Sequence, residues 1–229
     1  MSDSGFLLVN KPPGITSFGV IARLRKITNI KKIGHAGTLD PFATGLLIVA
    51  VGREATKQIS NYMKMDKVYE ATFCFGATTE TLDPEREMVR DPKFRPEKVS
   101  DQAIHDMAKK FIGAISQTPP AFSAIKIKGV RAYLLARFGK NPEIPSRIVN
   151  IAGITISTIE RRDGLLFIRL TIGCGSGTYI RSLARDMAEA VGTTGYVTQL
   201  HRTSIGTFQI SDAKTLEELA NSWQTSFFH

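Results

Sequence analysis

The sequence predicts an α+β protein with a mixed, largely antiparallel sheet. Short strand-like runs alternate irregularly with amphipathic helical patterns, which is not the regular order of a parallel βαβ protein. Residues 147–160 and 165–172 flank an Arg162-Asp163-Gly164 turn and therefore predict a hairpin. The chain has 229 residues, 42% of them hydrophobic, which is enough for a proper core. We expect one domain over residues 1–229.

Strands and one basic helix dominate the first third of the chain. Residues 6–9 and 46–51 are apolar runs that predict buried strands, and residues 54–65 predict a helix. Thr16 or Ser17 can cap another helix, whose buried face would carry Val20, Ile21, Leu24 and Ile27. Residues 68–75 alternate as a strand does, and Tyr69 begins the apolar face.

The middle of the chain is basic. Residues 76–96 predict a long surface connection, and residues 100–115 predict an amphipathic helix. From Met107 to Pro142 there is no acidic residue, and cations alternate with Phe122, Tyr133 and Phe138. Such a surface suits RNA, because phosphates pair with the cations and unstacked bases pack on the rings. The alternative is a solvated basic helix whose aromatic side chains belong to the core.

A glycine-rich turn joins the predicted hairpin to the next helix. Residues 173–178 do not match a dinucleotide-binding loop, because Thr178 stands where a third glycine is required and the preceding strand belongs to a hairpin. Tyr179 and Arg181 lie at the start of the helix. Arg181 suits bidentate pairing with a carboxylate or phosphate, or a salt bridge to Asp186 or Glu189 on its own helix. Residues 197–208 predict a last strand, and Thr215 begins a capping box.

Charge, hydropathy and cysteine content favour a cytoplasmic protein that binds an anionic partner. The formal net charge is +9 and the pI is about 9.7, which favours an anionic partner, nucleic acid before a membrane surface. No apolar run is long enough to span a membrane, and the N-terminus does not read as a signal peptide. Cys74 and Cys174 read as reduced, buried thiols of a cytoplasmic protein. The histidines and cysteines form no ligand pattern, so we expect no metal and no cofactor.

One carboxylate stands out in residues 33–45. Asp40 is the first acidic residue after Asp3, and six cations lie between them. Nearby positive charge favours the ionised form of a carboxylate, which suits a nucleophile or a base that acts on an anionic polymer. The alternative is that Asp40 and Pro41 simply begin a turn.

Six strings in a fixed order resemble the bacterial TruB-type family of tRNA pseudouridine-55 synthases. They are KPPG at 11–14, GHAGTLDPFATG at 34–45, KVY at 67–69, GATTETLD at 76–83, PPAFSAIK at 119–126 and GTYIR at 177–181. The resemblance runs from about residue 5 to residue 219. It implies the pseudouridine synthase catalytic fold and an isomerase that converts uridine 55 in the T-loop of tRNA to pseudouridine.

The resemblance also implies roles for three reactive residues. Asp40 would be the essential catalytic aspartate and would act on a flipped-out uridine, as nucleophile or as base. Tyr69 would stack on the target base and is a candidate for removing the C5 proton. Arg181 would pair with Asp40 and keep it ionised.

Other residues would bind the substrate by the same resemblance. His35 would fill the space that the flipped base leaves in the RNA loop, and Tyr179 and Leu200 would line the uracil pocket. Lys11 would support the active-site loop. A segment of about residues 123–145 would close over the T-arm. No metal or cofactor is implied, and we expect a monomer that binds tRNA and no membrane. The family's usual extra C-terminal RNA-binding domain would be absent.

Two other functions compete with this interpretation. The acid-free span and the net charge of +9 also fit a non-catalytic tRNA-binding or tRNA-folding module. A glycoside or nucleoside hydrolase would require two carboxylates flanking the bond, and the motifs around Asp40 offer one.

Overall fold

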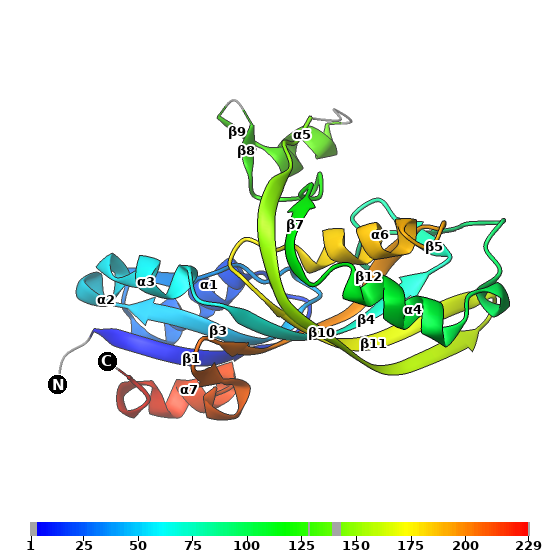
Figure 1. Ribbon diagram of the computed structural model, residues 1–229. Coiled ribbons are helices and arrows are strands. Elements are labelled where there is room, and N and C mark those ends of the chain that lie inside the picture. Colours follow the sequence, from blue (N-terminus) through cyan, green and yellow to red (C-terminus); the bar gives the residue numbers. More distant parts are fainter. Residues whose placement is uncertain (1–3, 128, 139–142, 229) are drawn as a thin grey trace. The chain divides into compact units, whose positions relative to one another are not determined.

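The computed structural model describes residues 4–127, 129–138 and 143–228, and its fold is α+β with a mixed sheet, as predicted (Figure 1). The chain divides into two compact units. The first unit comprises residues 1–70 and 200–229, and the second comprises residues 71–199. The unit boundaries fall inside two strands, β4 (Lys67–Phe75) and β12 (Gly195–Ile205), so each strand has a part in both units.

The first unit contains the two chain ends and most of the predicted N-terminal elements. Its strands are β1 (Gly5–Lys11), β2 (Ile33–Ala36), β3 (Thr44–Val51) and β13 (Phe208–Gln209). Its helices are α1 (Ser17–Thr28), α2 (Arg53–Lys57), α3 (Ile59–Met63) and α7 (Leu216–Ser222), with 3-10 turns at Ile210–Asp212 and Trp223–Thr225. The predicted capping box at Thr215 is present at the start of α7.

Strand β3 is the centre of the first unit. It pairs antiparallel with β1 and with β2, and it pairs in parallel with β12, where Arg202 lies opposite Gly45. A Cβ at Gly45 would lie 2.3 Å from the carbonyl oxygen of Arg202, and the φ of Gly45 is +104°. Glycine is therefore required where the loop after β2 enters β3.

Two apolar clusters cover β1 and β3 within the first unit. In one, Val20, Ile21 and Leu24 of α1 belong to the same cluster as Leu7 and Val49. The other contains a group of aromatic rings whose centroids lie 4.5 to 6.1 Å apart: Phe6, Tyr62, Phe208 and Phe228. These clusters fix the strand ends from which the loops of this unit depart.

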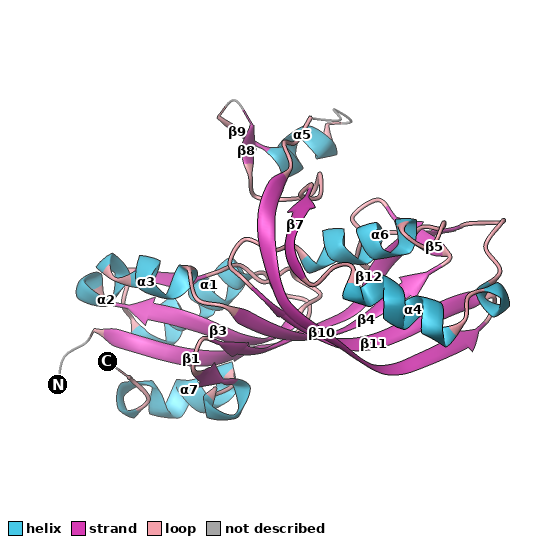
Figure 2. Cartoon of the chain, in the orientation of Figure 1, coloured by secondary structure: helices cyan, strands magenta, loops and turns pink. Residues whose placement is uncertain are grey.

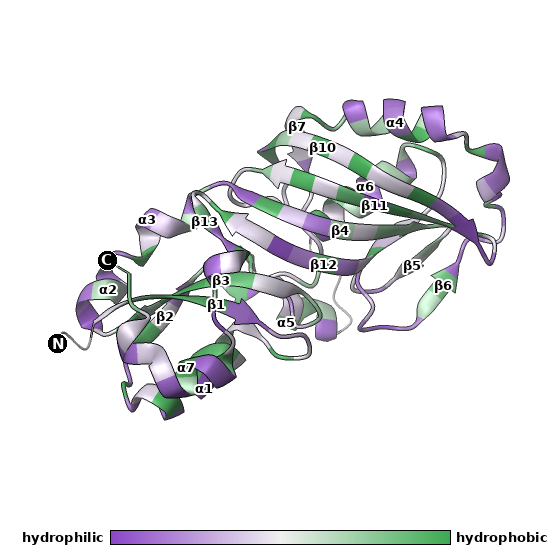
Figure 3. Ribbon diagram, turned by 90° about the horizontal axis from the view of Figure 1, so that it is seen from below, coloured by the Kyte–Doolittle hydropathy of each residue, from purple (hydrophilic) through white to green (hydrophobic). Residues whose placement is uncertain are grey.

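The second unit is built on a long hairpin. Strand β10 (Arg147–Arg162) pairs antiparallel with β11 (Leu165–Cys174) on one side and with β7 (Gly113–Gln117) on the other (Figure 2). The remaining elements are β5 (Ala77–Thr79), β6 (Met88–Arg90), a 3-10 turn at Pro96–Lys98, α4 (Asp101–Lys109), β8 (Lys126–Ile127), β9 (Val130–Arg131), α5 (Ala132–Arg137) and α6 (Ile180–Glu189). Along β10 and β11, hydrophobic and hydrophilic residues alternate (Figure 3).

Three predicted elements differ from the structure. The helix predicted over 100–115 ends at Lys109, because Gly113 has a φ of +96° and residues 113–117 pair with β10 instead. The connection predicted over 76–96 contains a small hairpin, in which Thr78 of β5 lies opposite Val89 of β6. The helix predicted over 54–65 is broken at Gln58 into α2 and α3.

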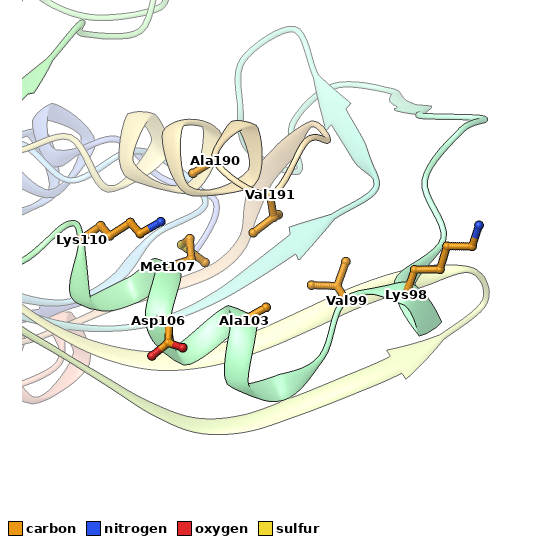
Figure 4. Close-up of a pocket in the computed structure, with 8 residues that line it drawn as sticks. All are labelled: Lys98, Val99, Ala103, Asp106, Met107, Lys110, Ala190 and Val191. Carbon is orange, nitrogen blue, oxygen red and sulfur yellow. The ribbon is translucent and has the colours of Figure 1, made fainter.

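A shallow pocket of about 390 Å³ lies in the second unit, between α4 and the end of α6 (Figure 4). Its lining is mainly apolar, with Val99, Met107 and Val191, and Lys98 and Lys110 also contribute. Over the described ranges, no helix is both long and apolar enough to cross a membrane.

Candidate active site

Asp40 lies in the loop between β2 and β3 of the first unit. Its side chain is half-buried, and its backbone carbonyl accepts a hydrogen bond from the N–H of Ala43 at 3.1 Å. This is a β-turn with an aspartate first and a proline second, which are favoured residues at these positions. The turn interpretation of the sequence is therefore correct for the backbone of Asp40, and it leaves the role of the carboxylate open.

Lys11 ties this loop to the end of β1. Its side chain is buried, and its Nζ donates hydrogen bonds to the carbonyl oxygens of Pro12 at 2.9 Å and Pro41 at 3.1 Å. The N–H of Gly14 also donates to the Pro41 carbonyl, at 2.9 Å. A buried ammonium is stable where it is hydrogen-bonded, and here the bonds fix the residue that follows Asp40.

Arg202 anchors the same loop from β12. It is 1% exposed, and its Nε donates to the carbonyl oxygen of Leu46 at 2.7 Å. One terminal nitrogen reaches the carbonyl oxygen of Gly37 at 3.3 Å. The loop between β2 and β3 is thus held at both ends by one buried guanidinium.

His35 precedes the loop, on β2 opposite Val49. Its imidazole is largely buried, and burial lowers the pKa of His35 below its usual range, with a further contribution from the positive charge of Arg202. A lowered pKa keeps the ring neutral at physiological pH. A neutral, flat side chain suits the predicted place of His35 within an RNA loop.

Tyr69 and Leu200 lie on the parts of β4 and β12 that belong to the first unit. Tyr69 is buried on β4 and Leu200 is buried on β12. The two strands are neighbours in this unit, because the hydroxyl of Thr203 on β12 donates to the carbonyl oxygen of Val68 on β4 at 3.3 Å. The first unit therefore holds five of the predicted site residues: Lys11, His35, Asp40, Tyr69 and Leu200.

Arg181 lies in the first turn of α6 in the second unit. It is 4% exposed, and its terminal nitrogens donate to the carbonyl oxygens of Thr81 at 2.7 Å and Phe122 at 3.0 Å. It also forms a buried ion pair with Asp83 at 3.3 Å. On α6 itself, Asp186 pairs with Arg185 at 2.7 Å. The structure therefore favours a precisely held arginine over a salt bridge along its own helix.

Tyr179 occupies the N-cap position of α6, and the side chain of Gln117 at the end of β7 holds its backbone. The N–H of Tyr179 donates to Oε1 of Gln117 at 2.8 Å, and Nε2 of Gln117 donates to the carbonyl oxygen of Tyr179 at 3.1 Å. The guanidinium carbon of Arg147 lies 4.9 Å from the centre of the Tyr179 ring. Both the backbone and the ring of Tyr179 are thereby fixed within the second unit.

The basic segment of about residues 123–145 belongs to the second unit. Its described part forms β8, β9 and α5, which lie beyond the ends of β7 and β10 (Figure 1). Val130, Leu134 and Phe138 expose apolar surface there, and the guanidinium of Arg137 lies 5.6 Å from the centre of the Tyr133 ring. Residues 128 and 139–142 of this segment lie outside the described residues.

Sequence patterns do not identify several residues that hold the site. Asp83 is the last residue of the string at 76–83, and Gln117 lies at the end of an element. Arg202 is one more cation in a strand-like stretch. Of the two candidates for the cap of α1, the structure selects Thr16, whose hydroxyl accepts a hydrogen bond from the N–H of Gly19 at 2.8 Å. Within the described ranges, no three His, Cys, Asp or Glu side chains gather as a metal site requires.

The predicted pairing of Asp40 with Arg181 joins residues of different units and stays a prediction. The backbone around Asp40 and the side chain of Arg181 are each held within their own unit by the contacts described above.

Comparison with known proteins supports the resemblance seen in the sequence. Residues 25–180 match the model of the TruB family pseudouridylate synthase N-terminal domain, and residues 181–226 match that of the tRNA pseudouridylate synthase B C-terminal domain. A protein of Corynebacterium diphtheriae named tRNA pseudouridine synthase B is 43% identical over 96% of this chain and 73% of its own length. A Thermobifida fusca protein of the same name is 41% identical over 94% of this chain and 74% of its own length.

A solved structure shows the same fold. A chain in the crystal structure of a Cbf5-Nop10-Gar1 complex superposes with a TM-score of 0.72 at 29% identity, over 96% of this chain. The present chain spans about half of that protein, 55% of its length. The family match over residues 25–180, the curated relatives and this fold agree, and the chain belongs to the TruB family of pseudouridylate synthases.

Proposed function

We propose that this protein converts uridine 55 in the T-loop of tRNAs to pseudouridine. The observation that carries the proposal is identity of more than 40% to proteins named tRNA pseudouridine synthase B, over nearly the whole chain. The Asp40 loop supports it, because buried cations hold the loop in place while the carboxylate stays half-buried. This function takes precedence over a non-catalytic tRNA-binding module, because the family is one of synthases.

The reaction is an isomerisation. The N1–C1′ glycosidic bond of the uridine breaks, the uracil turns, and a C5–C1′ bond forms; C5 loses a proton and N1 gains one. The target base must leave its stack, which costs a few kcal/mol that contacts within the protein must offset. His35 would occupy the vacated space in the RNA loop, and Tyr69 would stack on the flipped base.

Asp40 would act on the flipped nucleotide as nucleophile or base, and both roles need the ionised carboxylate. Arg181 would pair with Asp40 and favour that form. Its contacts with Asp83, Thr81 and Phe122 restrict the guanidinium to one position, which reduces the cost of orienting it when substrate binds. Tyr179 and Leu200 would line the uracil pocket.

The whole chain would serve as the catalytic domain, acting as a monomer in the cytoplasm. The reduced state that the cytoplasm maintains fits Cys74 and Cys174, which are both buried thiols. The basic segment that includes β8, β9 and α5 would close over the T-arm of the tRNA.

The test is direct mapping of pseudouridine in an unmodified tRNA transcript after incubation with the protein. We expect pseudouridine at position 55 and none there when a transcript with cytidine at that position is used. Folded protein that leaves uridine 55 unchanged would overturn the proposal. Release of free uracil or an abasic site would instead indicate a hydrolase.

A further inference from the structure

Ser17 is the first residue of α1, and its side chain points away from the helix cap. Thr16 provides the cap, so the Ser17 hydroxyl is available for another contact. Ser17 is 1% exposed, and its Oγ donates a hydrogen bond to the carbonyl oxygen of Leu39 at 3.0 Å. The same oxygen accepts a hydrogen bond from the N–H of Leu39 at 2.8 Å.

This reciprocal pair fixes one peptide segment in both directions. A hydroxyl has one donor and can accept at the same time, so Ser17 satisfies both backbone groups of Leu39. Leu39 itself is buried, and unpaired backbone groups at a buried position are costly. Loss of the hydroxyl would therefore allow the segment to shift until water or another group paired with it.

Asp40 follows Leu39, and Pro41, on the other side of Asp40, is also held by hydrogen bonds. The carbonyl of Pro41 accepts hydrogen bonds from Lys11 and Gly14, as described above. The backbone of Asp40 is thus restrained from both neighbours, by the buried side chains of Ser17 and Lys11. Restraint on both sides fixes the direction of the Asp40 carboxylate more closely than either contact alone.

We propose that Ser17 is a positioning residue for the synthase reaction, which sets the place of the Asp40 carboxylate through the backbone of Leu39. The role rests on the proposed function of Asp40 and adds a residue outside the loop to it. Ser17 would not touch the RNA. Its loss would lower the rate of the chemical step and leave tRNA affinity nearly unchanged.

Thr28 at the other end of α1 offers a matched control. It is also buried, and its hydroxyl also makes two backbone hydrogen bonds, donating to Leu24 at 2.9 Å and accepting from Ile30 at 3.1 Å. Ser17→Ala and Thr28→Val each remove one buried hydroxyl with two bonds from the same helix. Only Ser17→Ala releases the segment next to Asp40.

The experiment compares single-turnover rates, tRNA dissociation constants and Tm for the wild-type protein, Ser17→Ala and Thr28→Val. Misplacement of a catalytic group by about 1 Å can cost about 100-fold in rate. We expect Ser17→Ala to lower the rate about 10- to 100-fold, with the dissociation constant changed less than about threefold. Thr28→Val should lose a similar amount of Tm and keep a rate within about twofold of wild type.

Each alternative outcome has a distinct meaning. Equal rates for Ser17→Ala and Thr28→Val, or an effect of Ser17→Ala confined to tRNA affinity, would overturn the positioning role. If Ser17→Ala does not fold, Ser17→Cys keeps a weak S–H donor on a slightly larger side chain and should show an intermediate rate; a wild-type rate would contradict the proposal. Absence of pseudouridine with the wild-type protein would refute the proposed function itself, and with it this role.

Discussion

Three buried cations bond to loops that carry or adjoin predicted site residues. Lys11, Arg202 and Arg181 are each less than 5% exposed, and each donates to at least one backbone carbonyl. Burial of a charge is expensive unless hydrogen bonds or an opposite charge compensate it. Three such residues beside loops of the candidate site indicate that the sequence maintains loop geometry at a cost in stability.

His35 makes stability depend on pH. Its pKa is lowered by burial, and secondarily by Arg202, so the unfolded chain binds a proton more readily than the folded protein does. His35 therefore leaves stability unaffected at high pH and lowers it as the pH drops below about 6.5, the ordinary pKa of histidine. We expect the Tm of the wild-type protein to fall more between pH 7.5 and 5.5 than that of His35→Gln. Equal losses in the two proteins would contradict this assignment.

At the scale of elements, α6 is attached to the end of β7 by side chains that bond to backbone groups. Gln117 pairs with both backbone groups of Tyr179, and Ser182 and Arg185 both donate to the carbonyl oxygen of Thr118, at 2.8 and 3.0 Å. These bonds fix the start of the helix that carries Tyr179 and Arg181. The fold thus uses one strand end to place two predicted site residues.

Gln117→Leu should destabilise the protein strongly. It leaves the half-buried N–H of Tyr179 without its partner, while the carbonyl of Tyr179 still accepts a hydrogen bond from the N–H of Leu183, so we expect a loss of about 1–3 kcal/mol in urea unfolding. The same substitution at Gln102, which lies exposed on α4 and bonds to Asp106, is the control and should change stability by less than about 0.5 kcal/mol. Equal effects at the two positions would show that Gln117 does not anchor α6.

The elements best predicted from the sequence are those whose pattern lies within the element itself. The alternation of Tyr69, Ala71, Phe73 and Phe75 marks β4, and the Asp163-Gly164 turn marks the β10–β11 hairpin. Gly113 shows the limit, because only its pairing with β10 reveals that the helix before it must end.

The sequence does not predict the side-chain contacts that hold the site, because they join residues that are far apart in the chain. Ser17 and Leu39 are 22 residues apart, and Arg202 and Leu46 are 156 apart. A serine at the start of a helix predicts a cap, and a lone arginine in a strand-like stretch predicts an exposed charge. Only the folded chain shows that both side chains are turned inward to hold the Asp40 loop.

At the scale of the whole molecule, positive charge is the property that governs encounter with RNA. The net charge of +9 favours fast association with an anionic polymer, and exposed cations on β8 and α5 would contact its phosphates. Removal of one phosphate-binding cation should lower the slope of log affinity against log salt by about one.

The salt dependence of tRNA binding therefore tests the role of this segment. The double variant Lys126→Ala, Arg137→Ala should bind tRNA more weakly and with a slope reduced by about 2. The double variant Lys93→Ala, Lys98→Ala removes two exposed cations elsewhere in the second unit and should leave the slope nearly unchanged. Identical slopes for the two variants would exclude the segment as a phosphate-binding surface.

The most direct test of the whole account concerns one carboxylate. Asp40→Asn keeps the size and the turn geometry of the side chain and removes its charge, so folding and tRNA affinity should remain close to those of the wild-type protein. Pseudouridine formation at position 55 should be abolished, measured by mapping after incubation of an unmodified transcript with either protein. Turnover by folded Asp40→Asn at a rate near that of the wild-type protein would contradict the account.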